Sequence, residues 1–241
     1  MRLAVLSDIH ANLEAFEQVL ADIDRSDVDA IVSLGDNIGY GPDPNAVIGL
    51  LQERRIPSVL GNHELAVLSA RHLNWFNPLA RRSVRWTIDM LSLPSRAFVS
   101  RLPGALVLHG CQFVHGFPPR SITTYLFQVS PQRLLNAFRR LPVPLCFIGH
   151  THNLERLEYD GQAVSRNPLA AGSLPLSLEH RHILNIGAVG QPRDGDNSAK
   201  YVIWDSLEKI LTVRYVPYDI ASVVRKIKAA GLPESHADRL W

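Results

Sequence analysis

The sequence has few cysteines, no long hydrophobic run and almost no net charge. Only two of its 241 residues are cysteine, and both Cys111 and Cys146 lie in apolar segments, which predicts reduced thiols in a protein core. No segment approaches the roughly 18 apolar residues that a membrane helix requires. The 25 basic and 23 acidic residues leave a net charge of +2, too little to steer the chain towards nucleic acid or acidic membranes. The apolar start, residues 3–6, is too short for a signal peptide, so we expect a cytoplasmic globular protein.

Short apolar runs alternate with helical patterns in the first part of the chain. Residues 2–7, 30–34 and 57–60 predict buried strands, and the spacing from Leu13 and the pair Asp43-Pro44 predict the helices between them. Repeated strand–helix units indicate an α/β fold with a largely parallel sheet.

The second half of the chain is richer in predicted antiparallel strands. No linker separates two domains, so we expect a single domain over residues 1–241. The remaining predicted elements are helices within 65–101, 130–140 and 220–230, hairpins at 105–114 and 155–166, and strands near 145–148, 182–186, 201–205 and 211–216.

Metal-ligand side chains recur where apolar strands end. Any one of them alone would be read as a helix cap or turn residue. Together they indicate a metal site, because the crevice beyond the carboxyl ends of strands binds ligands and because imidazoles and carboxylates share a preference for cations. Without a cysteine, a closed zinc-finger site is not favoured, and the number of donors favours two metals over one tetrahedral ion. The residues are Asp8, His10, Asp36, Asn62, His63, His115, His150 and His152.

Five ordered motifs carry a family resemblance. They are Asp8-Ile9-His10, Gly35-Asp36, Gly61-Asn62-His63-Glu64, His115-Gly116 and Gly149-His150-Thr151-His152. Together they resemble the signature of the calcineurin-like metallophosphoesterases, over roughly residues 1 to 216. The resemblance is to small bacterial phosphodiesterase-like members. It implies a two-sheet β-sandwich flanked by helices, a four-layer αββα fold.

The resemblance also implies a ligand set for two divalent metals. One metal would be held by Asp8, His10 and His152, and the second by Asn62, His115 and His150, with Asp36 bridging the two. His63 would lie beside the metals, close to the departing oxygen. Mixed nitrogen and oxygen ligands favour manganese, iron, nickel, cobalt or zinc over magnesium.

The implied reaction is hydrolysis of a phosphodiester or phosphomonoester by a metal-bridging hydroxide. Two cations would bind the phosphate oxygens and lower the pKa of a shared water towards about 7. His63 is the candidate to donate a proton to the leaving oxygen, which is typically worth about 10²–10⁴ in rate. The expected partner is a small phosphorylated substrate such as a nucleotide, and the sequence indicates no oligomeric state.

The second motif departs from that of two related groups. Protein phosphatases and symmetric dinucleoside-tetraphosphate hydrolases resemble Gly-Asp-x-x-Asp-Arg-Gly there, whereas residues 35–41 contain no arginine. The missing arginine disfavours a Ser/Thr phosphoprotein phosphatase, although another arginine could replace it. A phosphoprotein phosphatase and a dinucleoside polyphosphate hydrolase are kept as alternatives. A scaffold that only binds another protein is a third, although every ligand position is filled.

Two residues outside the motifs are weaker candidates for substrate binding. Arg193, in the glycine-rich segment 185–195, could bind a phosphate or could pair with Asp194 or Asp196. Tyr40 could stack on a base or on a phenyl leaving group.

The segment 65–101 admits two interpretations. It could roof the active site, or it could pack Trp75, Leu79 and Trp86 inwards with its arginines in solvent. Its basic residues form no run interleaved with aromatics, so no nucleic-acid surface is expected.

The other histidines are not assigned to the site. His109 lies in a predicted hairpin turn, which favours His115 as the ligand. Surface or structural roles are expected for His72, His180, His182 and His236.

Overall fold

The computed structural model describes residues 1–241, folded into two mixed β-sheets and eight α-helices. The first sheet has the strand order β2-β1-β10-β11-β8, and the second has the order β3-β4-β5-β9-β6-β7. The strands are β1 (Arg2–Leu6), β2 (Ala30–Ser33), β3 (Leu106–Leu108), β4 (Cys111–Phe113), β5 (Leu145–Ile148), β6 (Leu154–Tyr159), β7 (Val164–Pro168), β8 (Gly172–Pro175), β9 (Arg181–Ile186), β10 (Ala199–Asp205) and β11 (Ile210–Val216). The helices are α1 (Leu13–Asp24), α2 (Pro44–Glu53), α3 (Asn62–Leu68), α4 (Pro78–Met90), α5 (Leu93–Val99), α6 (Pro131–Arg140), α7 (Ile220–Ala229) and α8 (Glu234–Asp238), with 3₁₀ turns at Ala70–Trp75 and Leu126–Gln128.

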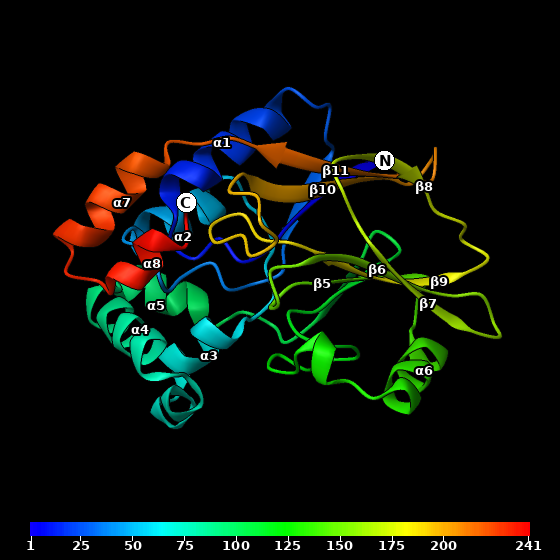
Figure 1. Cartoon of the computed structure of the whole chain (residues 1–241), viewed down its shortest axis with the longest axis horizontal. Coiled ribbons are helices and arrows are strands. Elements are labelled where there is room, and N and C mark those ends of the chain that lie inside the picture. The colour runs from blue at the N-terminus through cyan, green and yellow to red at the C-terminus, as the bar shows by residue number, and fades with distance from the viewer.

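The two sheets pack face to face between layers of helix, which confirms the expected four-layer fold (Figure 1). Successive side chains of a strand point to opposite faces of its sheet, so each strand can pack against the other sheet and against a helix layer. In β1, Val5 faces the core between the sheets, whereas Leu6 packs against α1. In β5, Phe147 faces the core between the sheets and Ile148 packs against α6. Because both faces of these strands are buried, their sequences are continuous apolar runs.

The sheets are mainly antiparallel, so the expectation of a largely parallel sheet is wrong. Among the paired strands only β1–β2, β4–β5 and β5–β9 are parallel. The β10–β11 hairpin joins the first sheet antiparallel to β1, and β6 joins the second antiparallel to β9. The repeated strand–helix units near the N-terminus therefore predict the parallel pairing of β1 with β2 but not the antiparallel pairs formed by later strands.

Two local predictions also differ from the structure. Residues 57–60 form an isolated bridge between Ser58 and Ser33 instead of a strand, because the amide of Leu60 bonds to Pro103 and the chain enters α3 at once. The edge strand β8 was not predicted, because its sequence Gly-Ser-Leu-Pro has no alternating apolar pattern.

Helices α2, α3, α4, α5, α7 and α8 gather at one end of the sheets (Figure 1). In this group Trp75 and Leu79 are exposed, at 62% and 50%, so the inward packing expected for them is wrong; Trp86 alone packs against α7 and α8. No helix in the structure has the length and apolarity needed to cross a membrane.

Candidate metal centre

Loops that follow β1, β2, β4 and β5 meet at one edge of the two sheets, together with the start of α3. Backbone hydrogen bonds connect these loops directly: the amide of Asp8 donates to Gly35 (3.1 Å), and the amide of His10 donates to Asp36 (2.9 Å). The amide of His150 donates to Asp8 Oδ2 (3.0 Å). The structure thus brings together all eight residues predicted from the strand ends, and all except Asn62 are buried.

Several of these residues have a left-handed backbone. The φ angles are 54° at Asp8, 52° at His10, 48° at Asp36, 68° at His150 and 61° at His152. Non-glycine residues rarely adopt this conformation, and its cost is maintained where a functional arrangement of side chains needs it. The sharp turns aim successive side chains of each loop into one cleft.

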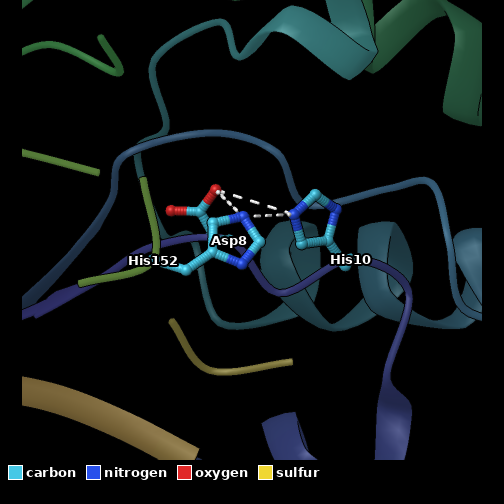
Figure 2. A group of neighbouring side chains, drawn as sticks. All are labelled: Asp8, His10 and His152. Carbon is cyan, nitrogen blue, oxygen red and sulfur yellow. Dashed lines mark hydrogen bonds and ion pairs between the residues drawn. The ribbon is translucent and has the colours of Figure 1, made fainter. Parts of the chain in front are cut away.

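The first cluster consists of Asp8, His10 and His152 (Figure 2). The two Nε2 atoms are 3.1 Å apart, and Asp8 Oδ1 lies 3.1 Å from His152 Nε2 and 3.6 Å from His10 Nε2. Figure 2 shows these three atoms facing one another. Each could donate a lone pair to the same ion.

The orientation of the two imidazoles points to a cation between them. His10 Nδ1 donates to the carbonyl of Ile38 (3.2 Å), and His152 Nδ1 donates to that of Gln191. The two rings therefore turn their Nε2 atoms towards each other, next to the Oδ1 atom of Asp8, which is buried and accepts no hydrogen bond. Such an arrangement is costly unless a positive ion lies among the donors.

The second cluster is formed by Asp36, Asn62, His115 and His150. His115 Nε2 lies 3.1 Å from Asn62 Oδ1, 3.2 Å from Asp36 Oδ2 and 3.2 Å from His150 Nδ1. His115 Nδ1 donates to the carbonyl of Leu34 (2.9 Å), so this ring also has a fixed orientation. The mixture of carboxylate, amide and imidazole donors fits a divalent transition metal.

Asp36 and His63 lie between the two clusters. Asp36 Oδ2 is 4.0 Å from His10 Nε2, 3.2 Å from His115 Nε2 and 3.9 Å from His63 Nε2. Its other oxygen accepts the backbone amide of His63 (2.8 Å). His63 is buried, and its Nδ1 atom has no hydrogen-bond partner. It is close enough to Asp36 and His10 to act as a further ligand or as a proton donor.

Burial and these contacts set the pKa values of the carboxyl and imidazole groups in the two clusters. Burial lowers the pKa of His150 to about 3 and that of His152 to about 4, so both present lone pairs at neutral pH. Although burial opposes ionisation of Asp36, the neighbouring imidazoles of His115 and His63 hold its pKa below the ordinary value. Burial also opposes the charged form of His115, but Asp36 raises its pKa to about 9.

Glu64 organises the loop that carries Asp36. Its fully buried carboxylate accepts the backbone amides of Asp36 (2.9 Å), Asn37 (2.7 Å) and Gly61 (3.1 Å). Glu64 lies in the first turn of α3, and its contact with Gly61 is a capping interaction of that helix. The contacts with Asp36 and Asn37 join segments far apart in the chain, and no sequence pattern indicated them.

The weaker substrate-binding candidates also lie at this edge. The ring of Tyr40 is surrounded by the imidazoles of His10, His63 and His236, with centroids 4.6, 4.6 and 4.7 Å away. Arg193 Nη2 donates to Gln191 Oε1 (3.0 Å), and its positive charge opposes the burial that raises the pKa of Tyr40. The exposed guanidinium of Arg193 therefore lies near Tyr40.

The alternative pairing of Arg193 with its acidic neighbours is not observed. Asp194 and Asp196 instead bind the buried ammonium group of Lys200, at 2.7 and 3.2 Å.

The remaining histidines lie outside the clusters. His109 lies in the β3–β4 turn, as expected, with φ 51°. His180 pairs with Glu158, and His182 Nε2 bonds to the carbonyl of Ser177 (2.8 Å). His72 is buried against Trp75, and buried His236 bonds to Ser83 Oγ (3.1 Å). The two cysteines are free and buried, as expected.

Comparisons with known proteins agree on one family. The family model for calcineurin-like phosphoesterases matches residues 1–154, which contain all eight candidate residues. A metallophosphoesterase from Sphaerobacter thermophilus has a similar crystal structure, with 38% identity, a TM-score of 0.85 and coverage of 100% of this chain and 98% of that one.

Two archaeal proteins are similar over nearly their whole length. An uncharacterized protein of Methanocaldococcus jannaschii is 34% identical over 248 residues, which cover 99% of this chain and 97% of the relative. The crystal structure of a hypothetical protein from Pyrococcus horikoshii shares the fold with a TM-score of 0.82 at 16% identity, covering 100% of this chain and 97% of that one.

Proposed function

The chain belongs to the calcineurin-like phosphoesterase family, and from that premise we propose that it is a two-metal hydrolase of small phosphorylated substrates, in particular nucleotides. The proposed ligands are those implied by the motifs: Asp8, His10 and His152 for one metal, Asn62, His115 and His150 for the other, and Asp36 between them.

One observation carries this proposal. His10 and His152 direct two Nε2 atoms at each other across 3.1 Å, although both rings already donate through Nδ1 to backbone carbonyls. A cation explains this arrangement, whereas a protein-binding scaffold has no need of it. Divalent metals at such a site supply Lewis-acid stabilisation of phosphoryl oxygens and activation of water.

Two side chains that are not proposed metal ligands would also contribute to the reaction. His63, packed between Asp36 and Tyr40, would hold a proton near the leaving oxygen. Arg193 would bind a phosphoryl oxygen, because its guanidinium is a fork of donors that matches an oxyanion.

The test is hydrolysis by purified, manganese-loaded protein. We expect phosphate-ester hydrolysis to be abolished by chelation, and Asp36→Asn to lower kcat/KM at least about 100-fold, since even outer-shell partners of metal ligands are worth about 10–100-fold. Asp24→Asn is the matched control, because Asp24 pairs with Arg54 on the exposed surface.

The substrate panel should contain mono- and diesters, dinucleoside polyphosphates and phosphopeptides. Faster turnover of nucleotides than of phosphopeptides is expected. Turnover that survives Asp36→Asn, or folded, metal-loaded protein inactive on every ester, would rule out the proposed enzyme.

A further inference from the structure

A cavity of about 270 Å³ opens beside the second cluster of candidate ligands. Asn62 and His150 line it, so a molecule in the cavity would touch the proposed metal centre directly. Four of its nine lining residues are aromatic, although aromatic residues make up only 7% of the chain. This enrichment indicates a site that recognises a flat apolar group.

The aromatic rings of the cavity are not equivalent. Tyr125 lies flat against His150, with ring centroids 3.8 Å apart, and Phe76 places its ring edge-on to His63 at 4.9 Å. Tyr40 is enclosed by three imidazoles. Trp75 is 62% exposed and meets only His72 edge-on at 4.5 Å. Trp75 is therefore the ring with a surface available for stacking.

Exposure of Trp75 does not come from a loose segment. The guanidinium of Arg81 donates to the carbonyls of Leu73 (3.0 Å), Asn74 (3.3 Å) and Phe76 (3.1 Å), which bracket Trp75 in the chain. Because the backbone on both sides of Trp75 is held in this way, stacking of a ligand would restrict the side chain of Trp75 and not the segment that carries it.

The polar part of the cavity is small and uncharged. Besides Asn62 and His150, the polar side chains of Asn77 and Thr123 line it, and no Asp, Glu, Lys or Arg does. Because Asn77 Oδ1 accepts the amide of Ala80 (2.9 Å), its amino group is the one available to a ring-edge acceptor. The volume lies below the roughly 300–1,000 Å³ typical of drug-sized ligands, so it accommodates one ring system and not a whole dinucleotide.

We infer that this cavity binds the planar aromatic ring of the phosphoester substrate, a nucleobase or an aryl group, with Trp75 as its stacking surface. The inference rests on the proposed function, since it places the ring next to the metal that would hold the phosphate. Within the segment 65–101, residues 75–80 then form one wall of the substrate site, and the loop with Thr123 and Tyr125 forms the other.

The experiment compares substrates with and without the ring. Manganese-loaded wild type and Trp75→Leu are assayed on adenosine 5′-monophosphate, phenyl phosphate and ribose 5-phosphate. Trp241→Leu is the matched control, because Trp241 is also exposed, at 68%, and does not line this cavity. We expect Trp75→Leu to lower kcat/KM about tenfold for the ring-bearing esters, within the range of aromatic stacking on a base, and to leave ribose 5-phosphate within about twofold. Trp75→Phe should recover part of the loss.

Equal effects of Trp75→Leu on all three esters, or no effect on any, would overturn the inference and leave the proposed function intact. If no ester is hydrolysed, the proposed function fails. The inference about the cavity is then tested separately, by measuring the binding of adenosine 5′-monophosphate. Quenching of tryptophan fluorescence by adenosine 5′-monophosphate in wild type, lost in Trp75→Leu and not produced by ribose 5-phosphate, would support it. Absence of that quenching would contradict it.

Discussion

Each proposed imidazole ligand in the first cluster is oriented by a backbone carbonyl. Ile38 and Gln191 accept the Nδ1 protons of His10 and His152, which leaves both Nε2 atoms to point into the cleft. His115 is oriented by Leu34 in the same way. Hydrogen bonds of this kind fix the tautomer and raise the basicity of a metal-binding ring. The residue-scale geometry is therefore that of a site prepared for a cation.

A close approach at Gly149 offers a direct test of this geometry. A Cβ atom there would lie 1.9 Å from Ser7 Oγ and 2.6 Å from Asp8 Oδ2, so Gly149→Ala must displace the Asp8 carboxylate. We expect manganese affinity, measured by titration calorimetry, to fall about 10–100-fold while the far-ultraviolet circular dichroism stays native.

Gly49→Ala is the control for this substitution. Gly49 lies within α2 with no atom within 4 Å of the added methyl, so the change should raise stability by up to about 1 kcal/mol and leave the affinity unaltered. Unchanged metal affinity in Gly149→Ala would contradict the placement of Asp8 in the site.

Prediction from sequence succeeded at those residues whose environment is local. Asp8 and Asp36 follow the neighbouring parallel strands β1 and β2, whose carboxyl ends meet at one sheet edge, and His150 follows the buried strand β5 of the other sheet. The contacts of Glu64 with Asp36 and the cavity wall at Tyr125 depend on segments that are distant in the chain. No spacing or periodicity encodes such contacts.

At the scale of elements, strands were predictable where both faces are buried. The continuous apolar run Leu145–Ile148 could only be a core strand or a buried helix, and its shortness favoured the strand. Whether neighbouring strands are parallel or antiparallel was not predictable, because it depends on which strands the later hairpins pair with. The exposed edge strand β8 carries too little apolar pattern to be recognised.

Helix α1 is held to the first sheet by a buried carboxylate. Asp22 accepts the hydroxyl of Tyr201 (2.8 Å) and two guanidinium donors of Arg214 (3.0 and 2.8 Å). Burial alone would raise the pKa of Asp22, but these hydrogen bonds hold it below the ordinary value. The carboxylate therefore stabilises the fold above the unfolded-state pKa of about 3.9, and the contribution is lost as the pH falls through the folded-state value.

Asp22→Asn should accordingly lower the free energy of unfolding at pH 7 by about 1–3 kcal/mol. The difference from wild type should start to shrink below about pH 4, where Asp22 of the unfolded wild-type chain takes up a proton, and should vanish below the lower folded-state pKa. Urea denaturation at a series of pH values measures both effects. Asp24→Asn should cost no more than about 1 kcal/mol, since Asp24 and Arg54 form an exposed pair. A difference that stays constant down to pH 3 would contradict this account of Asp22.

At the scale of the whole molecule, the site depends on segments beyond the family signature. The family model ends at residue 154, yet the carbonyl of Gln191 orients His152 and that of Gly190 accepts the side chain of Asn12 (2.9 Å). The C-terminal helix α8 packs His236 against Tyr40. Segments from the first and the last part of the sequence thus contribute to the cleft, in agreement with a structural match to the Sphaerobacter protein that covers 100% of this chain.

The most direct test is to locate bound metal in the manganese-reconstituted protein by anomalous diffraction, with elemental analysis of the same material. We predict two manganese ions per chain, one enclosed by Asp8, His10 and His152 and one by Asn62, His115 and His150, with Asp36 contacting both. Reconstituted protein that holds no manganese in this cleft, or holds it only elsewhere on the surface, would contradict the account.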